Sequence, residues 1–96
     1  MAIDIIRRDD GSAGDYTASV DGARAGALTY RRTGRWLTVT HTEALPAFRG
    51  QGIAYALVER LAADARAEGS RIVPLCWYAR EKLNENPAWQ DLVEGR

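Results

Sequence analysis

The segment "HTEALPAFRGQGIAYALVERL", residues 41–61, decides how the rest of this chain is interpreted. A strand-like run, residues 36–40, leads into it, and a helical pattern that starts at Ile53 leads out of it. Between them lies the linker "RGQG", residues 49–52, which has two glycines and one arginine. The first N–H groups of a helix are unsatisfied and carry partial positive charge, and an arginine adds a charged donor. The linker therefore favours a bound anion, such as a diphosphate, over a merely tight strand-to-helix turn.

The pattern on both sides of this segment predicts a mixed α/β fold with one sheet. Alternating and β-branched residues predict four strands before it, with short turns that make them an antiparallel meander. After it, apolar residues recur at spacings of three and four from Ile53 to Ala65, which predicts a long helix that ends at Gly69. A strand, a crossover helix and another strand make the fourth and fifth strands parallel neighbours. The expected strands are 3–8, 15–20, 25–32, 36–43 and 71–76, and the expected helices are 53–68, 77–86 and 88–93.

The composition limits the class of protein. The 96 residues carry 13 basic and 13 acidic side chains, a formal net charge of +0, and are 46% hydrophobic. This balance argues against disorder, and against nucleic-acid or anionic-membrane partners, which need a basic excess. Cys76 is the single cysteine and His41 the single histidine, so no internal disulfide can form and no metal site is expected. We find no signal peptide or membrane span and expect a cytoplasmic protein with one domain, residues 1–96.

Two common phosphate-binding motifs do not fit the linker. A Walker loop continues with Lys-Ser or Lys-Thr, but Ile53 and Ala54 follow here. A dinucleotide fingerprint needs a third small residue where Tyr55 stands, and the all-β start of this chain is wrong for that fold. What remains is a general anion site at a helix N-terminus.

The order of several motifs resembles a known family. "RGQGIA", residues 49–54, is similar to the R/Q-x-x-G-x-G/A signature of GNAT-superfamily N-acetyltransferases, and it lies, as there, between a fourth strand and a long helix. "HTE" at 41–43, "CWY" at 76–78 and the later Asn86-Pro87 resemble a group of very short GNAT-like proteins. The resemblance covers about residues 15–93 at the level of the fold.

One departure from the family concerns the acceptor side. Larger GNAT enzymes carry two helices between their first two strands, whereas this chain has only "DDGSAGD", residues 9–15. The acceptor side is therefore expected to be open or differently built.

The resemblance implies acetyl-CoA as the donor, held where the fourth and fifth strands part, with its pyrophosphate at the glycine linker. It also implies that the main-chain N–H of Leu45 polarises the thioester carbonyl, since Pro46 has no N–H to donate. Asn84 is a further expected contact, although Asn near Pro is also common turn chemistry. The expected cofactor-binding residues are Thr42, Leu45, Arg49, Gly50, Gln51, Gly52, Ile53, Ala54 and Asn84.

Glu43 and His41 are the candidates for accepting the proton of the amine. Glu43 is the first choice, because the family often keeps a carboxylate at the end of the fourth strand. Unbroken alternation would place both residues on the apolar face of Leu37 and Val39, whereas a bulge would reset the alternation. His41 belongs to the residue type that titrates nearest neutral pH, but it could equally be a hydrogen-bonded core histidine.

Cys76 and Tyr78 are the candidates for chemistry near the CoA sulfur. Cys76 would close the fifth strand there and could form an acetyl-cysteine, or it could merely pack. Tyr78 could protonate the departing thiolate, or it could pack on the sheet. We expect the three tryptophans to pack in the core or at its rim: Trp36, Trp77 and Trp89.

These interpretations lead to one function and one alternative. We expect an acetyl-CoA-dependent N-acetyltransferase that acts by direct transfer on a primary amine, either a small molecule or a protein lysine. The alternative is a non-catalytic acyl-CoA-binding or regulatory module. A monomer or weak dimer is expected, with the edge of the first or the fifth strand available for pairing.

Overall fold

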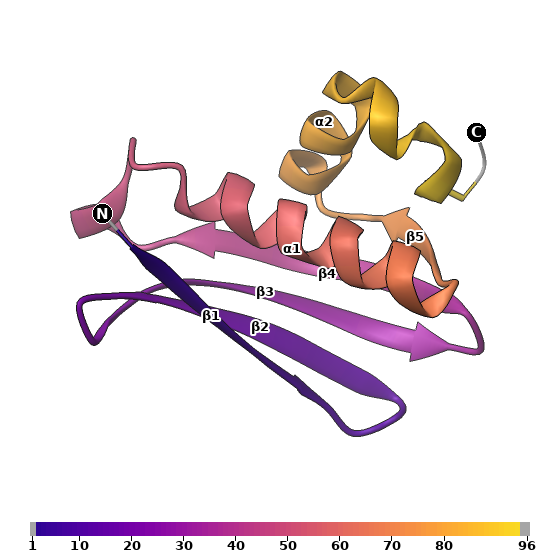
Figure 1. The fold of residues 1–96 in the computed structure, drawn as a ribbon, viewed down its shortest axis with the longest axis horizontal. Coiled ribbons are helices and arrows are strands. Elements are labelled where there is room, and N and C mark those ends of the chain that lie inside the picture. The colour runs from indigo at the N-terminus through magenta and orange to yellow at the C-terminus, as the bar shows by residue number, and fades with distance from the viewer. Residues whose placement is uncertain (1, 95–96) are drawn as a thin grey trace.

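The computed structural model describes residues 2–94, in which one five-stranded sheet carries a long helix across one face (Figure 1). The strands are β1 (Ile3–Asp9), β2 (Ala13–Val20), β3 (Ala23–Thr33), β4 (Trp36–Ala44) and β5 (Arg71–Pro74). The helices are α1 (Ile53–Glu68) and α2 (Trp77–Glu85), and two 3₁₀ turns are η1 (Pro46–Phe48) and η2 (Pro87–Leu92). The mixed α/β fold predicted from the sequence is confirmed.

The strands lie in chain order, β1-β2-β3-β4-β5. The first four are antiparallel, and β5 is parallel to β4, as the crossover argument predicted. In Figure 1, α1 lies along the sheet and α2 lies beside it near β5, while no helix among residues 2–94 covers the opposite face. We call that opposite face the open face.

The fifth strand is shorter than predicted. It ends at Pro74 instead of Cys76, because the chain turns after Pro74 and α2 begins at Trp77. The N–H groups of Leu75 and Cys76 instead both donate to the carbonyl oxygen of Val39, at 3.1 and 3.2 Å. Cys76 therefore becomes the N-cap residue of α2.

The core lies between α1 and the sheet. The apolar stripe predicted for the helix is buried along its whole length, and it packs on alternate residues of the strands. The start of α1 approaches the sheet closely at Gly26 in β3, where a Cβ atom would lie 2.8 Å from Cγ2 of Ile53. Gly26 thus lets the N-terminus of α1 rest against the sheet, and the predicted stop at Gly69 is confirmed as the C-cap.

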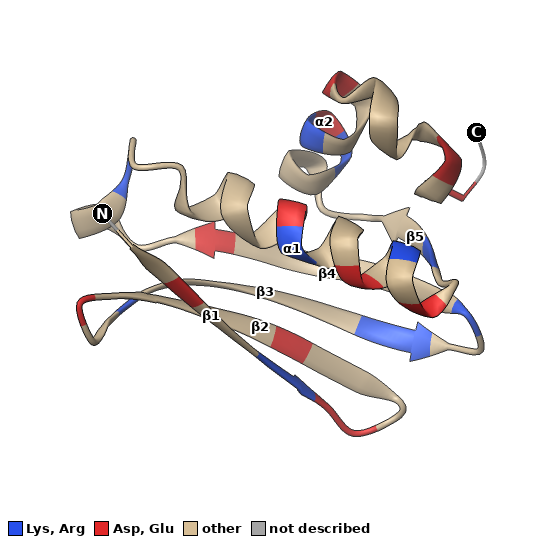
Figure 2. Ribbon diagram, viewed as in Figure 1, with Lys and Arg blue, Asp and Glu red and all other residues tan. Residues whose placement is uncertain are grey.

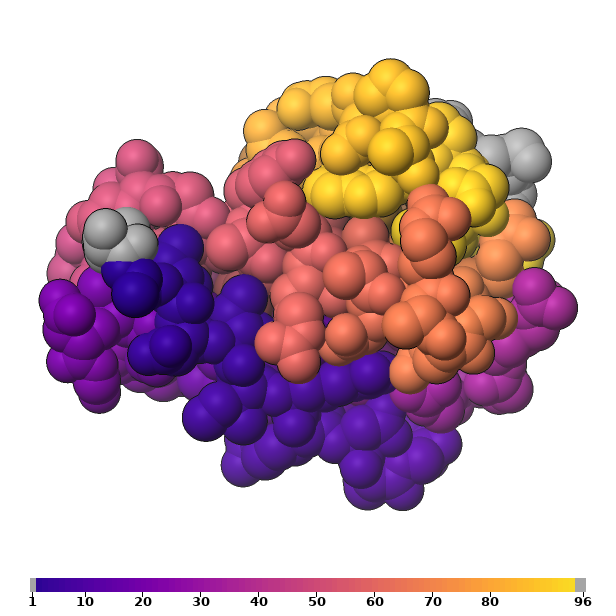
Figure 3. Space-filling model, viewed as in Figure 1, coloured from indigo at the N-terminus to yellow at the C-terminus, as the bar shows by residue number. Residues whose placement is uncertain are grey.

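A polar cluster fixes the other end of α1. The hydroxyl of Tyr16 in β2 donates to Asp64 at 2.8 Å, and Arg7 in β1 donates to Glu68 at 3.1 Å. In Figure 3, α1 accordingly lies wedged between the indigo first strand and the yellow C-terminal segment. With both ends held, the helix presents its N-terminus at a fixed place beyond the end of β4.

Candidate active site

A gap between β4 and β5 is the central feature of the site. The two strands pair only from Trp36 with Arg71 to Val39 with Pro74. Beyond Val39, β4 continues to Ala44, while the chain after Pro74 turns away into α2. The edge of residues 40–44 that faces β5 is therefore left without a strand partner within residues 2–94. Such a gap can receive an extended ligand that carries hydrogen-bonding groups.

A β-bulge at Thr40 decides which side chains face this gap. Thr29 pairs with His41 but Tyr30 pairs with Val39, so Thr40 is skipped. The prediction from unbroken alternation is therefore wrong, and the bulge that was weighed against it is present. His41 is exposed on the open face, and its side chain does not share the buried face of Val39.

The bulge brings Thr42 to the helical face and Glu43 to the open face. The Thr42 Oγ1 atom is buried and has no hydrogen-bond partner among the described residues. The Glu43 side chain is 38% exposed; its Oε1 lies 3.4 Å from Nε2 of His41 and 4.0 Å from a guanidinium nitrogen of Arg24. Glu43 therefore lies beside polar groups, and the apolar setting expected for it is wrong.

The main-chain N–H of Leu45 does not face the gap. It donates to the carbonyl oxygen of Ala25 in β3 at 2.8 Å, so the role implied for it by the resemblance is contradicted. In an antiparallel ladder the N–H groups of alternate residues point to opposite sides. The N–H of Leu45 points toward β3. The N–H groups of Ala44 and Thr42, one and three residues before it, therefore point the other way, toward the gap. The sequence analysis did not identify Ala44, because the direction of its N–H depends on how β4 pairs with β3.

The linker before α1 forms an uncapped helix N-terminus. Gly50 and Gly52 have φ angles of +82° and +77°, which favour glycine, and Gly52 is the N-cap of α1. The cap carries no side-chain hydrogen bond, and the first turn has no acidic residue. The Ile53 side chain is buried in the core, so this residue can offer only its backbone. Arg49 is exposed beside the linker, so N–H groups and one guanidinium are available to an anion.

Cys76 lies at the opposite end of the gap. Burial opposes ionisation of its thiol, but backbone N–H groups outweigh burial and lower the pKa of Cys76: those of Ala79, Tyr78 and Thr42. The Thr42 backbone contributes across the gap, and its hydroxyl lies near the sulfur without full hydrogen-bond geometry. A thiol held in this way at a helix N-terminus has enhanced thiolate character and is a candidate nucleophile.

A cleft of about 330 Å³ lies between the linker before α1, the end of β4 and the start of α2. The surface in Figure 3 is hollowed between the pink segment that precedes α1 and the C-terminal elements. The lining residues are Thr42, Glu43, Ala44, Arg49, Ala54, Trp77 and Tyr78. The structure thus brings Thr42, Glu43, Arg49, Ala54 and Tyr78 of the predicted residues to one place.

Two aromatic residues of α2 border the cleft. Burial raises the pKa of Tyr78, and although Lys82 opposes this, the phenol stays a proton donor at neutral pH. Trp77 is 69% exposed, so the expectation that it packs in the core or at its rim is wrong. No signal in the sequence distinguishes Trp77 from a packing tryptophan.

Eight predicted residues lie outside the cleft lining: His41, Leu45, Gly50, Gln51, Gly52, Ile53, Cys76 and Asn84. Gln51 is exposed in the linker. His41 contacts the site only through Glu43. Asn84 lines a separate shallow hollow with Trp77 and Arg80 on α2.

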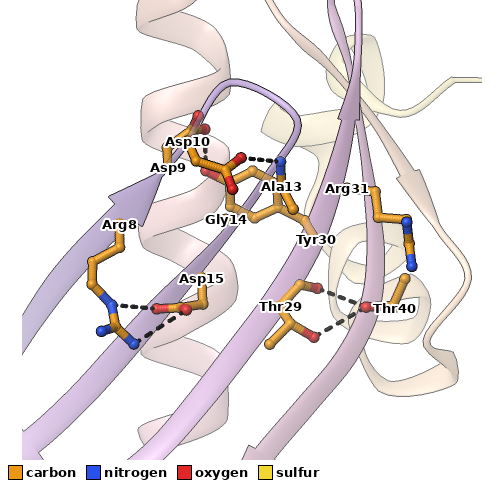
Figure 4. A pocket seen from close by; sticks show the side chains of 10 residues that line it. All are labelled: Arg8, Asp9, Asp10, Ala13, Gly14, Asp15, Thr29, Tyr30, Arg31 and Thr40. Atoms are coloured by element: carbon orange, nitrogen blue, oxygen red, sulfur yellow. Dashed lines mark hydrogen bonds and ion pairs between the residues drawn. The ribbon is translucent and has the colours of Figure 1, made fainter.

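A larger hollow, of about 540 Å³, lies on the open face and was not predicted (Figure 4). Several of its polar groups bond to one another: Arg8 pairs with Asp15, and the hydroxyls of Thr29 and Thr40 lie 3.0 Å apart. Because these groups satisfy each other, this hollow offers less to a ligand than the cleft does.

No set of three His, Cys, Asp or Glu side chains suited to a metal ion occurs within residues 2–94. No described helix combines the length and the apolar character needed to cross a bilayer.

Comparison with known proteins agrees with this geometry. The sequence profile of the family described as "GCN5-related N-acetyl-transferase" matches residues 15–92. The chain belongs to this family. No curated protein matches the chain by sequence. The uncapped N-terminus of α1 and the parted strands are therefore features of a GCN5-related N-acetyltransferase (GNAT) domain.

Solved structures share the GNAT fold of this chain. A ribosomal-protein-alanine N-acetyltransferase from Brucella melitensis biovar Abortus 2308 superposes with a TM-score of 0.72 and 20% identity, over 88% of this chain and 90% of that one. A predicted acetyltransferase with acetyl-CoA from Clostridium acetobutylicum gives a TM-score of 0.61 and 18% identity, over 79% of this chain and 57% of that one.

AAC(6')-Iy, in complex with a bisubstrate analogue, CoA-S-monomethyl-acetylneamine, gives a TM-score of 0.61 and 16% identity, over 78% of this chain and 60% of that one. The chain thus spans less than two thirds of the length of the last two structures. At these identities the comparison establishes the shared fold.

Proposed function

We propose that this chain is an acetyl-CoA-dependent N-acetyltransferase that moves an acetyl group to a primary amine, either of a small molecule or of a protein lysine. The observation that carries the proposal is the gap between β4 and β5. The cleft at this gap is lined by Arg49 and Ala54, beside the uncapped N-terminus of α1, and by Thr42 and Tyr78, which hydrogen-bond the Cys76 thiol of lowered pKa. A pyrophosphate bound at one end and a thioester bound at the other match the two ends of acetyl-CoA.

The groups of the cleft fit acetyl-CoA by type. The first N–H groups of α1 and the guanidinium of Arg49 suit a pyrophosphate. The N–H of Ala44 and the unpartnered hydroxyl of Thr42 suit the amide and carbonyl groups of the pantetheine arm. These groups, rather than Leu45, would stabilise the negative charge that develops on a carbonyl oxygen during acyl transfer.

Proton transfer is assigned to residues at the mouth of the cleft. Acetyl-CoA supplies the acetyl group as a thioester, whose carbonyl carbon is open to attack by an amine. Glu43, supported by its contact with His41, accepts the proton that the attacking amine loses on the open face. Tyr78 keeps its proton at neutral pH and can donate it to the departing sulfur. This is direct transfer, the expected course.

One observation favours a second route. The lowered pKa of Cys76 makes its thiolate available. The thiolate would attack the carbonyl carbon, the bond from that carbon to the sulfur of CoA would break, and an acetyl-cysteine would form. The amine would then take the acetyl group, release the thiolate and pass its proton to Glu43.

Two experiments test the proposal. Calorimetric titration with acetyl-CoA, CoA and desulfo-CoA measures binding, and release of free CoA with a panel of primary amines and lysine peptides measures turnover. Glu43→Gln is expected to bind acetyl-CoA normally and to lose turnover, whereas Glu81→Gln on the exposed side of α2 serves as the matched control.

Cys76→Ala distinguishes the two routes. Direct transfer predicts retained turnover and no acetylated protein when the wild type meets acetyl-CoA alone, measured by intact-protein mass. The cysteine route predicts lost turnover and one added acetyl group. Binding without turnover on any amine would support the non-catalytic alternative, and absence of binding by the folded protein would overturn both.

A further inference from the structure

The two edges of the sheet are not equivalent. The outer edge of β5 is covered, because Ile72 forms a parallel bridge with Val93 and its carbonyl oxygen accepts the N–H of Glu94 at 2.8 Å. The outer edge of β1 has no strand partner within the described residues 2–94. Of the two edges considered from the sequence, only β1 therefore remains available along its length.

The edge of β1 lacks most of the usual protections against pairing. Natural edge strands are kept apart by short length, proline, a bulge or charged side chains, lysine above all, and of these β1 has only charged side chains of both signs. β1 has seven residues, and it pairs with β2 in an unbroken register from Ile3 with Val20 to Asp9 with Gly14. Its Ile6 side chain is 64% exposed, so an apolar residue stands uncovered in the middle of the edge.

One side chain of the described residues bonds to the backbone of β1. Arg60 of α1 donates through Nη1 to the carbonyl oxygen of Ile5 at 3.3 Å. Arg60 approaches β1 from the face of the sheet that carries α1, and its side chain is 41% exposed. It can move aside, and the open face of β1 stays free.

The charges on the open face of β1 are complementary to those of a second, antiparallel copy of the same strand. Asp4, Ile6 and Arg8 alternate on this face, and each is exposed. Figure 2 shows the acidic segment near the start of β1 and the basic segment near its end. In an antiparallel copy of the same strand, the acidic end therefore meets the basic end.

We propose that β1 pairs antiparallel with β1 of a second copy of this chain, about a two-fold axis at Ile6. Asp4 then lies opposite Arg8 of the second copy and Arg8 opposite its Asp4, with the two Ile6 side chains in contact between them. The two sheets become one continuous sheet, with both α1 helices on the same side. This inference does not rest on the proposed function.

The charge pattern selects this register over its neighbours. A two-fold axis at Arg7 would place two arginines directly opposite each other, which is destabilising. An axis at Ile5 would place Asp4 opposite Ile6 and leave Arg8 beyond the paired residues. The axis at Ile6 pairs all seven residues of β1 and matches both charges.

The partner that Arg8 has within its own chain does not prevent this pairing. Arg8 reaches back to Asp15 on β2 at 3.4 Å, as Figure 4 shows, and its side chain is 76% exposed. An exposed ion pair of this kind contributes little to stability. Arg8 can therefore be shared between Asp15 and Asp4 of the second copy.

Two charge-reversal variants test the register, with sedimentation velocity over a range of concentrations as the measurement. Asp4→Arg would place arginine opposite arginine at both ends of the pair, and Arg8→Asp would place aspartate opposite aspartate. Each variant alone is expected to raise the dimer dissociation constant by about tenfold or more. An equimolar mixture is expected to form a heterodimer, because both charge pairs are then complementary again.

Controls keep the outcome interpretable. Arg31→Asp changes the net charge as Arg8→Asp does, at an exposed position on β3, and is expected to leave the dimer unchanged. Raised salt is expected to weaken the wild-type dimer. The inference is overturned if the wild type stays monomeric at the highest concentration, if either single variant dimerises as the wild type does, or if the mixture does not associate. Recovery of association in the mixture also shows that both variants are folded.

Discussion

Removing the charge of Arg49 is expected to weaken CoA binding without affecting the fold. Arg49 is exposed, borders the cleft beside the N-terminus of α1, and its side chain makes no ion pair with any residue that the structure describes. Its loss therefore leaves no buried partner uncompensated. Any change in affinity for CoA then measures the lost contact between Arg49 and the ligand.

The size of the effect follows from the chemistry of the contact. A hydrogen bond to a charged group contributes about 1.5–3 kcal/mol, and about 1.4 kcal/mol corresponds to a tenfold change in affinity. Arg49→Ala is therefore expected to weaken CoA binding about tenfold to a hundredfold. Arg49→Glu is expected to weaken it further, because a carboxylate there repels the pyrophosphate and competes for the uncapped N–H groups of α1.

Calorimetric titration with CoA at two salt concentrations is the assay. Arg35→Glu is the matched control, because Arg35 is exposed in the turn at the opposite end of β4 and its reversal changes the net charge equally. It is expected to bind CoA like the wild type. Unchanged binding by Arg49→Glu would refute the assignment of the pyrophosphate site. An equal loss in Arg35→Glu would show that only the overall charge matters.

Three further outcomes are expected. The rate of Cys76 alkylation should rise with pH about a midpoint below that of an ordinary cysteine, because hydrogen bonds outweigh burial and lower its pKa; a midpoint at or above the ordinary value would contradict this. Leu57→Ala should lower the free energy of unfolding by about 2–5 kcal/mol in urea titrations, since the Leu57 side chain of α1 is fully buried in the core, and a loss well under 1 kcal/mol would contradict that packing. The bonds from Arg32 and Tyr30 lower the pKa of Asp9, so their contribution is present above the unfolded pKa of about 3.9 and is lost as pH falls through the folded value. The wild type should thus lose stability on acidification more steeply than Asp9→Asn, and parallel curves would contradict the assignment.

Much of the fold could be predicted because its signals are local. Alternation along residues 15–20 and the three-and-four spacing from Ile53 to Ala65 depend on neighbouring residues alone, and they predicted β2 and α1. The glycine linker was also readable, since an uncapped helix start needs only the residues beside it. The crossover rule then predicted that β5 lies parallel to β4.

The details of the candidate site could not be read in the same way. Whether Glu43 faces the helix or the open side depends on the bulge at Thr40, which exists only because β4 pairs with a particular register of β3. The same pairing commits the N–H of Leu45 to Ala25 and frees that of Ala44. The bulge at Thr40 thus reverses the face on which each later side chain of β4 lies.

The sequence by itself determined the order of strands and helices, the glycine linker, and the presence of a single cysteine and a single histidine. Only the tertiary structure decided that Cys76 lies beside Thr42 across a gap, that Trp77 is exposed, and that β5 closes one sheet edge while β1 leaves the other open. The physical reason is range. Periodicity and capping act between residues a few positions apart, whereas strand register and the parting of β4 from β5 depend on contacts between segments distant in the chain.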